Sequence, residues 1–161
     1  MKDNIVIRTG TPDDYERVIA VMPDWWNGRD LTGMVLKIFF VHFRNTIFIA
    51  EANGEIVGFL MGLFSQYYPD EAYIQFAGIH PNWRKSGLGR TLAEQFFDAC
   101  RENGRTIVKS STAPINTDSI AFHTRLGFEI QPGDGEVSGI PVVMDYHRKN
   151  DPKVSFVKVL D

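Results

Sequence analysis

Hydrophobic positions along the chain recur with two periods, which predict a regular succession of strands and helices. Short runs rich in β-branched and aromatic residues predict strands at residues 5–8, 46–51, 56–63, 72–80, 106–110, 127–130, 142–146 and 154–160. Apolar residues three or four positions apart predict helices at 11–23, 31–44, 89–104 and 116–125. The dipeptide Asn53-Gly54 predicts a tight hairpin between two of the strands. This order of elements predicts a mixed α/β (α+β) fold in which helices cover a single sheet.

Length and composition favour one globular domain spanning residues 1–161. The chain is 43% hydrophobic and has a net charge of -3, and that charge argues against a nucleic-acid partner. The first residues contain no apolar stretch long enough for a signal peptide or a membrane span, so we expect a cytoplasmic protein without a membrane partner. Cys100 is the only cysteine and the four histidines are scattered, so no metal site is expected.

A basic, glycine-containing loop joins the strand at residues 72–80 to the helix that follows. Its sequence is Arg84-Lys85-Ser86-Gly87-Leu88-Gly89. Amides at the start of a helix point outward, the helix dipole is positive there, and glycine lets a phosphate approach the backbone. Because Arg84, Lys85 and Arg90 add positive charge, the loop predicts an anion site. The alternative is that the two glycines only permit a tight turn.

Two nucleotide-binding patterns do not fit this loop. A dinucleotide fingerprint requires a third glycine three residues after the second, where the chain has Leu92. A Walker A loop requires Gly-Lys followed by Ser or Thr, which is absent from the sequence. A nucleotide-binding enzyme remains an alternative, and it predicts stabilisation by ATP or NAD.

The loop and a second block of residues resemble the GNAT N-acetyltransferases. The sequence from Arg84 to Gly89 matches that family's Arg/Gln-x-x-Gly-x-Gly/Ala motif, and Ile79-His80-Pro81 precedes it as in many members. Asn116 followed by Ala121-Phe122-His123-Thr124-Arg125-Leu126-Gly127-Phe128 is similar to the family's Asn...Phe-Tyr-x-x-x-Gly-Phe signature. The element order fits the family fold from Ile5 to Leu160. Residues 131–152 are longer than the usual link, and an inserted hairpin is expected there.

The resemblance implies a GNAT-like mixed, mostly antiparallel central sheet with a splayed pair of strands and helices on both faces. The strands at 73–80 and 106–111 form that pair, with the pantetheine arm of acetyl-CoA between them. Backbone groups near Gly78 and Ile79 then bind the cofactor amides and polarise the thioester carbonyl. Asn116 faces the pantetheine arm or, alternatively, caps its helix. The implied cofactor-binding residues are Gly78, Ile79, His80, Arg84, Lys85, Ser86, Gly87, Leu88, Gly89, Arg90 and Asn116.

Candidate catalytic residues lie on the second block and on the strand before the loop. His123 stands where many relatives have a tyrosine beside the thiolate, so we expect a general acid there; the alternative is a histidine that packs or contacts the cofactor without chemistry. Tyr73 and Gln75 stand where relatives carry Glu or His, and the general base stays open. Alternation puts Tyr73, Gln75 and Ala77 on one face, where the first two are expected to line the acceptor pocket or to relay a proton through water.

Acceptor contacts are expected from a loop and a turn. Trp25 and Trp26 lie between the first two predicted helices; we expect at least one of them to contact the acceptor, and core packing is the alternative for the other. Glu71, with Asp24 and Asp30, is expected to attract a cationic amine. Glu71 is also a candidate base.

These features together predict an enzyme that moves an acetyl group from acetyl-CoA to a primary amine of a small molecule or a peptide. The amine attacks directly in a ternary complex, without a metal. Cys100 falls on the apolar stripe of its helix and is expected to be buried rather than to carry the acyl group. A non-catalytic acyl-CoA-binding or regulatory module with the same fold is the alternative, since the chain has no obvious glutamate base. A homodimer stays open.

Overall fold

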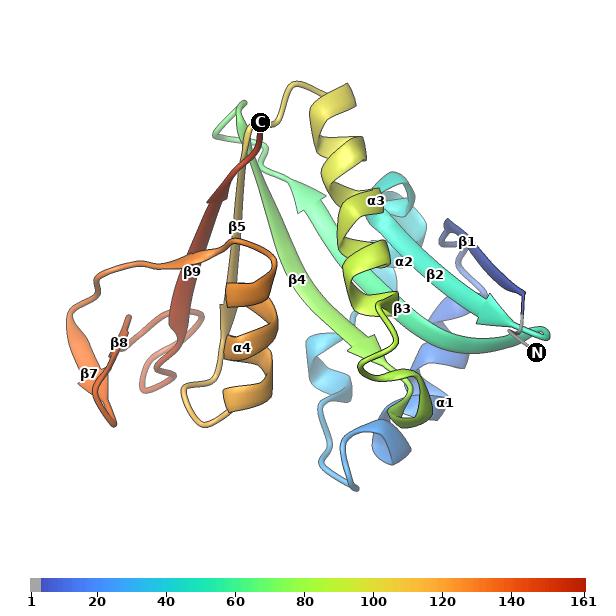
Figure 1. Cartoon of the computed structure of the whole chain (residues 1–161), viewed down its shortest axis with the longest axis horizontal. Coiled ribbons are helices and arrows are strands. Elements are labelled where there is room, and N and C mark those ends of the chain that lie inside the picture. The colour runs from blue at the N-terminus through green and yellow to red at the C-terminus, as the bar shows by residue number, and fades with distance from the viewer. Residues whose placement is uncertain (1–3) are drawn as a thin grey trace.

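The computed structural model describes residues 4–161, which contain a sheet of seven strands (Figure 1). Its strands are β1 (Ile5–Thr9), β2 (Ile47–Ala52), β3 (Glu55–Phe64), β4 (Glu71–Ile79), β5 (Ile107–Thr112), β6 (Glu129–Ile130) and β9 (Val154–Val159). The α-helices are α1 (Asp14–Trp25), α2 (Lys37–His42), α3 (Leu88–Glu102) and α4 (Thr117–Arg125). The strand order is β1-β2-β3-β4-β5-β9-β6, and every pair is antiparallel except β4 with β5. The predicted mixed, mostly antiparallel fold is confirmed.

Helices cover both faces of the sheet, and each face has its own hydrophobic core. Leu92 and Phe96 of α3 are buried against the sheet, and α4 lies on the same face (Figure 1). Met22 of α1 and Phe40 of α2 are buried on the opposite face. Burial of each such side chain stabilises the fold by about 2 kcal/mol. The apolar stripe predicted for α3 therefore determines which side of that helix meets the sheet.

The predicted hairpin at Asn53-Gly54 joins β2 to β3. Both residues have positive φ angles, 52° for Asn53 and 80° for Gly54. Two adjacent residues with positive φ are what a tight two-residue hairpin turn requires.

The expected inserted hairpin consists of β7 (Gly135–Val137) and β8 (Ile140–Val142). The prediction of a strand at 142–146 is wrong. Beyond Val142 the chain makes only isolated β-bridges and no continuous strand pairing. The reason is a polar turn: the amide of Asn150 donates a hydrogen bond of 2.8 Å to Oδ1 of Asp145, which bends this segment back on itself.

The first helix begins at Asp14 rather than at Thr11 and extends through Pro23 to Trp25. Its start is held by Asp14, whose Oδ2 accepts a hydrogen bond of 2.8 Å from the amide of Thr11. Thr11 therefore donates to a helical side chain instead of capping the helix itself. Trp25 was expected in a loop, and it is the last residue of α1.

The helix predicted over 31–44 is divided into a 3-10 turn at Thr32–Met34 and the short α2. Between them Leu36 has extended backbone angles, with φ -112° and ψ 138°. Val35 and Phe40 are both buried, yet in one continuous helix their side chains would point about 140° apart. The break lets both side chains reach the core.

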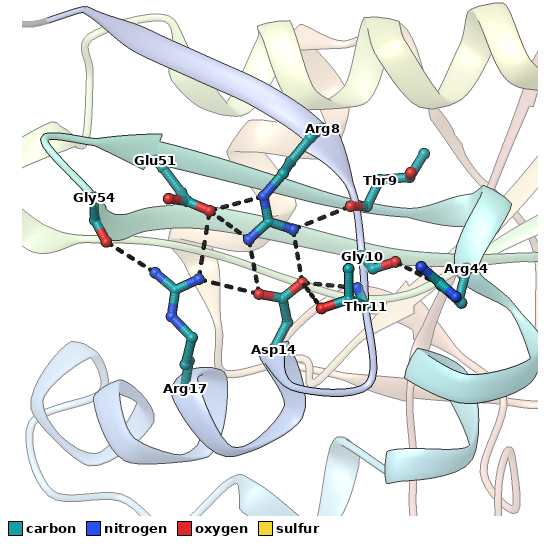
Figure 2. A network of polar contacts seen from close by, with 9 residues as sticks. All are labelled: Arg8, Thr9, Gly10, Thr11, Asp14, Arg17, Arg44, Glu51 and Gly54. Atoms are coloured by element: carbon teal, nitrogen blue, oxygen red, sulfur yellow. Dashed lines mark hydrogen bonds and ion pairs between the residues drawn. The ribbon is translucent and has the colours of Figure 1, made fainter.

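A network of charged residues fastens the start of α1 to the sheet (Figure 2). Arg8 on β1 binds the carboxylate of Asp14 with two hydrogen bonds of 2.7 and 2.8 Å, and its Nε donates to Glu51 on β2 at 2.8 Å. Arg17 on α1 donates to Asp14 at 3.2 Å and to the carbonyl of Gly54 at 2.9 Å. The network fixes the N-terminal end of the helix that carries Trp25 at its other end.

Candidate functional site

The parallel strands β4 and β5 are paired over only part of their length. Their pairing runs from Glu71 with Ile107 to Ile74 with Ser110. Beyond this point β4 is paired with β3 alone and β5 with β9 alone, and the two strands diverge (Figure 1). The splayed pair implied by the family resemblance is therefore present. Beyond Ile74 and Ser110 the facing edges of β4 and β5 are not paired with each other, and we call this unpaired stretch the gap.

A β-bulge at Gln75 lies where the strands part. On β3, Gly62 pairs with Ile74 and Met61 pairs with Phe76, so Gln75 has no partner in the register. An unpaired residue of this kind exchanges the two faces of a strand beyond it.

The bulge overturns the predicted alternation along β4. Ile74 packs in the core under α3, whereas Phe76 packs in the core under α1 and α2. Tyr73 therefore points to the side of α1, and Ala77 points to the side of α3. The expectation that Tyr73, Gln75 and Ala77 share one face is wrong, because sequence alternation assumes a strand without a bulge.

The backbone edge of β4 that faces the gap follows from its pairing with β3. The amide of His80 donates to the carbonyl of Val57 on β3 at 2.9 Å. Antiparallel pairing alternates, so the backbone groups of Gly78 also point toward β3, and those of Ala77 and Ile79 point toward the gap. Ile79, an expected cofactor contact, thus has its backbone groups on the gap side, and so does Ala77. Gly78 was also expected to contact the cofactor, but its backbone groups point toward β3 instead.

The helix start expected to bind a phosphate has the required backbone. Gly87 is the residue before α3, with φ 90°, and a side chain there would have no atom within 4 Å, so its glycine is needed for backbone geometry rather than for space. The amides of Gly89 and Arg90 belong to the first helical turn, where no preceding carbonyl of the helix reaches them. These donors and the positive end of the helix dipole are the features with which a helix start can accept an anion, so we keep this turn as the candidate anion site.

The basic side chains of the loop also bind backbone carbonyls. Arg84 donates through Nη2 to the carbonyl of Trp25 and through Nε to that of Ile79, the latter at 3.2 Å. Arg90 donates to the carbonyl of Arg125, at the end of α4, at 2.8 Å. The arginines therefore hold the loop against α1, β4 and α4 while they keep positive charge beside the amides.

The other loop positions differ in what they offer a ligand. Ser86 donates to the carbonyl of Trp83 and accepts from the amide of Leu88 at 3.3 Å. The Leu88 side chain is buried in the core. Lys85 is exposed and has a positive φ of 61°. Nδ1 of His80 accepts from the amide of Asn82 at 3.0 Å.

Gly89 allows two helices to approach each other. A Cβ atom there would lie 2.8 Å from the ring of Phe122 on α4. Asn116 caps α4, because its Oδ1 accepts a hydrogen bond of 3.1 Å from the amide of Ser119. The second sequence block is thus positioned directly against the loop.

His123 lies in the interior between α4 and the sheet. Its Nε2 is 2.9 Å from Oγ of Ser110, and its Nδ1 is 2.8 Å from the carbonyl of Ser119, which makes Nδ1 the donor. Its ring stacks on Phe156 at 4.3 Å between centroids. Burial lowers the pKa of His123, opposed by the hydrogen bond to Ser119. Both ring nitrogens have protein partners, and the neutral imidazole is favoured.

A second polar cluster lies on the opposite face of the sheet, where β4 and β5 part. Oη of Tyr73 is 2.9 Å from Oγ of Ser111 on β5 and 2.8 Å from Oη of Tyr146. Oγ of Ser111 is 3.5 Å from Nε2 of His147. Burial raises the pKa of Tyr73 well above its usual value. The inserted segment thus contributes two side chains to the cluster.

Ser111, Tyr146 and His147 were not among the residues singled out from the sequence. Ser111 is the next residue on its strand face after Lys109, and strand alternation could have placed it beside Tyr73. Tyr146 and His147 lie in an irregular segment with no periodic pattern to give their direction.

The expected acceptor residues have three different environments. Trp25 is 3% exposed and stacks on Phe59 in the core. Trp26 is half-buried, lies 5.2 Å from the ring of Phe76, and occupies the space that a side chain at position 78 would take. Glu71 forms an ion pair of 2.9 Å with Lys109.

Residues 4–161 contain no group of three or more His, Cys, Asp or Glu side chains arranged to hold a metal ion. Cys100 is buried in the core, and burial raises the pKa of its thiol to about 12. No helix in this range combines the length and apolar character needed to cross a bilayer.

The chain is similar to known acetyltransferases. The sequence model of the acetyltransferase (GNAT) family matches residues 11–128. The L-2,4-diaminobutyric acid acetyltransferase of Nocardia farcinica is 30% identical over 80 residues, which are 50% of this chain and 42% of that protein. The chain therefore matches less than half the length of this curated relative.

Solved structures have the same fold over nearly the whole chain. Ard1 from Thermoplasma volcanium superposes with a TM-score of 0.78 at 21% identity, covering 98% of both chains. Diaminobutyrate acetyltransferase EctA from Paenibacillus lautus, solved with L-2,4-diaminobutyric acid and coenzyme A, superposes with a TM-score of 0.69 at 20% identity, covering 97% of this chain and 95% of that one. Because the family model covers well over half of the sequence, the chain belongs to the GNAT acetyltransferase family.

Proposed function

We propose that this protein transfers an acetyl group from acetyl-CoA to a primary amine of a small molecule or a peptide. The observation that carries the proposal is the position of the anion site at the start of α3, directly after the strand whose free edge lines the gap. A ligand with a diphosphate at one end and an extended amide-containing arm at the other fits these two features together. Coenzyme A has both parts.

The residues that would bind the cofactor follow from this geometry. The pyrophosphate would meet the amides of the first turn of α3, around Gly87 and Gly89. The pantetheine amides would pair with the backbone groups of Ala77 and Ile79 along β4. Acetyl-CoA supplies an acetyl group activated as a thioester. An amide of β4 beside the gap would donate to the thioester oxygen, which gains negative charge when the amine attacks.

Direct attack by the amine is favoured over a covalent enzyme intermediate. Cys100 is buried, and its raised thiol pKa leaves it protonated at neutral pH. Ser110 is buried too, and its hydroxyl faces His123 in the interior. The amine and the thioester would instead meet where β4 and β5 are no longer paired with each other.

The acceptor would bind on the face of the sheet that α1 covers. Trp26, Phe76 and Tyr73 supply an aromatic wall there. The relative from Nocardia farcinica is named for a small diamine acid, which supports a small primary amine as the first acceptor to test. A peptide amine remains within the proposal.

A ligand screen followed by a turnover assay tests the proposal. CoA and acetyl-CoA should raise the melting temperature of the protein, whereas ATP and NAD should leave it unchanged. With acetyl-CoA present, addition of 2,4-diaminobutyrate or of peptides with a free amino terminus should release the CoA thiol. Stabilisation by acetyl-CoA with no release on any amine would favour the non-catalytic module. Stabilisation by ATP or NAD alone would overturn the proposal.

A further inference from the structure

Four side chains from three parts of the chain form a continuous polar path. Oη of Tyr146 is 2.8 Å from Oη of Tyr73, which is 2.9 Å from Oγ of Ser111. Oγ of Ser111 is 3.5 Å from Nε2 of His147, at the long end of the hydrogen-bond range. The path runs from the half-buried phenol of Tyr146, through the half-buried phenol of Tyr73 on β4, to the exposed imidazole of His147.

The hydrogen bonds along this path have a defined direction. Tyr73 donates its hydroxyl hydrogen to Ser111, so Ser111 keeps its own hydrogen to donate to Nε2 of His147. Tyr146 can then donate to Tyr73. Every hydroxyl hydrogen points along the path toward the imidazole, and the arrangement requires Nε2 of His147 to be an acceptor.

The Tyr73 hydroxyl lies close to the point where the pairing of β4 with β5 ends. Ile74 and Ser110 are the last paired residues of β4 and β5. Tyr73 and Ser111 flank this pair on the face opposite to α3. An amine that reaches a thioester in the gap from that face would pass beside the Tyr73 hydroxyl.

We propose that Tyr73, Ser111 and His147 form a proton relay that takes a proton from the acceptor amine, with His147 as the final proton acceptor. The relay rests on the proposed acetyl transfer and adds to it the identity of the base. The insertion at residues 131–152 would thereby complete the site that β4 and β5 begin.

The proton balance of the step is complete. The ammonium group of the acceptor gives one proton to Oη of Tyr73 while Tyr73 passes its own to Ser111 and Ser111 passes its own to Nε2 of His147. The freed nitrogen lone pair forms the C–N bond, the C–S bond breaks, and its electron pair goes to sulfur. The second proton of the nitrogen goes to the thiolate. The products are an amide, the CoA thiol and an imidazolium that returns its proton to solvent.

The environment of each group fits this role. The raised pKa of Tyr73 keeps the phenol neutral, so it passes a proton on without becoming a tyrosinate. Partial burial lowers the pKa of His147, Asp151 opposes that shift, and Lys153 and Arg148 add to it. His147 is therefore neutral near pH 7 and has an acceptor nitrogen available.

The carboxylates near the path are already paired with cations. Glu71 binds Lys109 at 2.9 Å, and Asp151 binds Lys153 at 3.2 Å. Each of these carboxylates is thus engaged by a lysine rather than by the hydroxyl groups of the path. His147 is left as the neutral base that the hydrogen-bond path reaches.

The test uses substitutions of His147 and Ser111, alone and together, with one control. His147→Gln and Ser111→Ala should each lower kcat/KM for the amine roughly 100-fold at pH 7, while the Kd for acetyl-CoA stays unchanged. Their double variant should be no slower than either single one, because both substitutions interrupt one path. His42→Gln, at an exposed histidine at the end of α2, is the matched control and should behave as wild type. Added imidazole should partly restore the rate of His147→Ala.

Two readouts separate the relay from a structural role and from the proposed function. The acidic limb of the wild-type pH–rate profile should disappear in His147→Gln. By NMR, the His147 imidazole should be neutral at pH 7 with its hydrogen on Nδ1, whether or not an acceptor is known. Wild-type turnover that His147→Gln leaves unchanged would overturn the relay alone. An imidazolium at pH 7 would also overturn it, and a wild-type protein that binds acetyl-CoA but acetylates no amine would contradict both proposals.

Discussion

The Nε2 atom of His123 on α4 lies 2.9 Å from Oγ of Ser110 on β5, and both side chains are buried. Nδ1 of the same ring is bonded within α4, and the ring stacks on Phe156 of β9. One side chain therefore joins a helix and two strands on the far side of the gap. These contacts support the alternative in which His123 packs, and they make its chemical role a matter for direct test.

Replacement of His123 by alanine should destabilise the protein more than it slows the chemistry. The variant loses ring packing and leaves the Ser110 hydroxyl without its partner, which together cost about 2 to 4 kcal/mol. Urea denaturation measures this loss, with Thr124→Ala at an exposed position of the same helix as the control. Turnover per folded molecule should be unchanged across pH. A selective loss of turnover in a stable variant would instead support His123 as general acid.

The same histidine should make stability depend on pH. Its pKa is lower in the folded protein than the usual value near 6.5, so below that pH the unfolded chain binds more protons than the folded one. Its contribution is fully present above about pH 6.5 and is lost as the pH falls further. The free energy of unfolding should fall more steeply between pH 7 and 5 in the wild type than in His123→Gln. Equal slopes would contradict the buried neutral imidazole.

Gly87 and Gly104 provide a matched pair for the anion site. Both have positive φ angles, 90° and 72°, and both have open space where a side chain would stand. Alanine at either position should therefore lower the free energy of unfolding by about 1 kcal/mol through backbone strain. Only Gly87→Ala should weaken CoA binding, by about tenfold or more, because only that glycine orients the first amides of α3. Calorimetry with both variants checks this, and equal CoA affinity would contradict the site.

Gly78 should influence the acceptor rather than the cofactor. A Cβ atom there would collide with the Trp26 ring and would stand 2.9 Å from Phe59. Gly78→Ala should displace Trp26, raise KM for the amine several-fold and cost about 1 to 3 kcal/mol of stability. Adding Trp26→Phe should recover part of the stability, since the smaller ring leaves room. Weakened acetyl-CoA binding with an unchanged amine KM would place Trp26 outside the acceptor site.

The network around Asp14 should contribute stability that acid removes. Burial opposes ionisation of Asp14, but the hydrogen bonds from Arg8 and Thr11 outweigh it and hold its pKa below the usual value. Asp14→Asn should lower the free energy of unfolding by about 2 to 3 kcal/mol. This loss is smaller than the one expected for a fully buried ion pair, because solvent reaches Arg8. The wild-type contribution is present above about pH 4 and is lost as the pH falls below it. Asp98→Asn, in an exposed pair with Arg101, is the control and should cost under about 0.5 kcal/mol.

Local features of the fold were predictable because short segments determine them. Asn53-Gly54 predicted its hairpin, since its positive φ angles depend on those two residues alone. The helix after Gly87 was predictable from its apolar stripe and from the glycine before it. The two family motifs then supplied the sheet and its splayed strands, which no short segment determines.

Features that depend on distant partners were not predictable. The bulge at Gln75 appears only when β4 is aligned with β3, because alternation of residue types along β4 is the same with or without it. The direction of Tyr146 and His147 depends on how residues 131–152 fold back over β5. Single sequences contain no periodic signal for either feature.

The division of the sheet at Ile74 and Ser110 has a mechanical consequence. One half consists of β1 to β4 and the other of β5, β9 and β6, and the β4–β5 ladder between them is confined to the four residue pairs at one end. This short pairing allows the two halves of the sheet to move as rigid bodies about the paired end. A ligand hydrogen-bonded to both β4 and β5 would restrict that motion. Rigidity of the whole molecule would then rise when such a ligand binds and fall when it leaves.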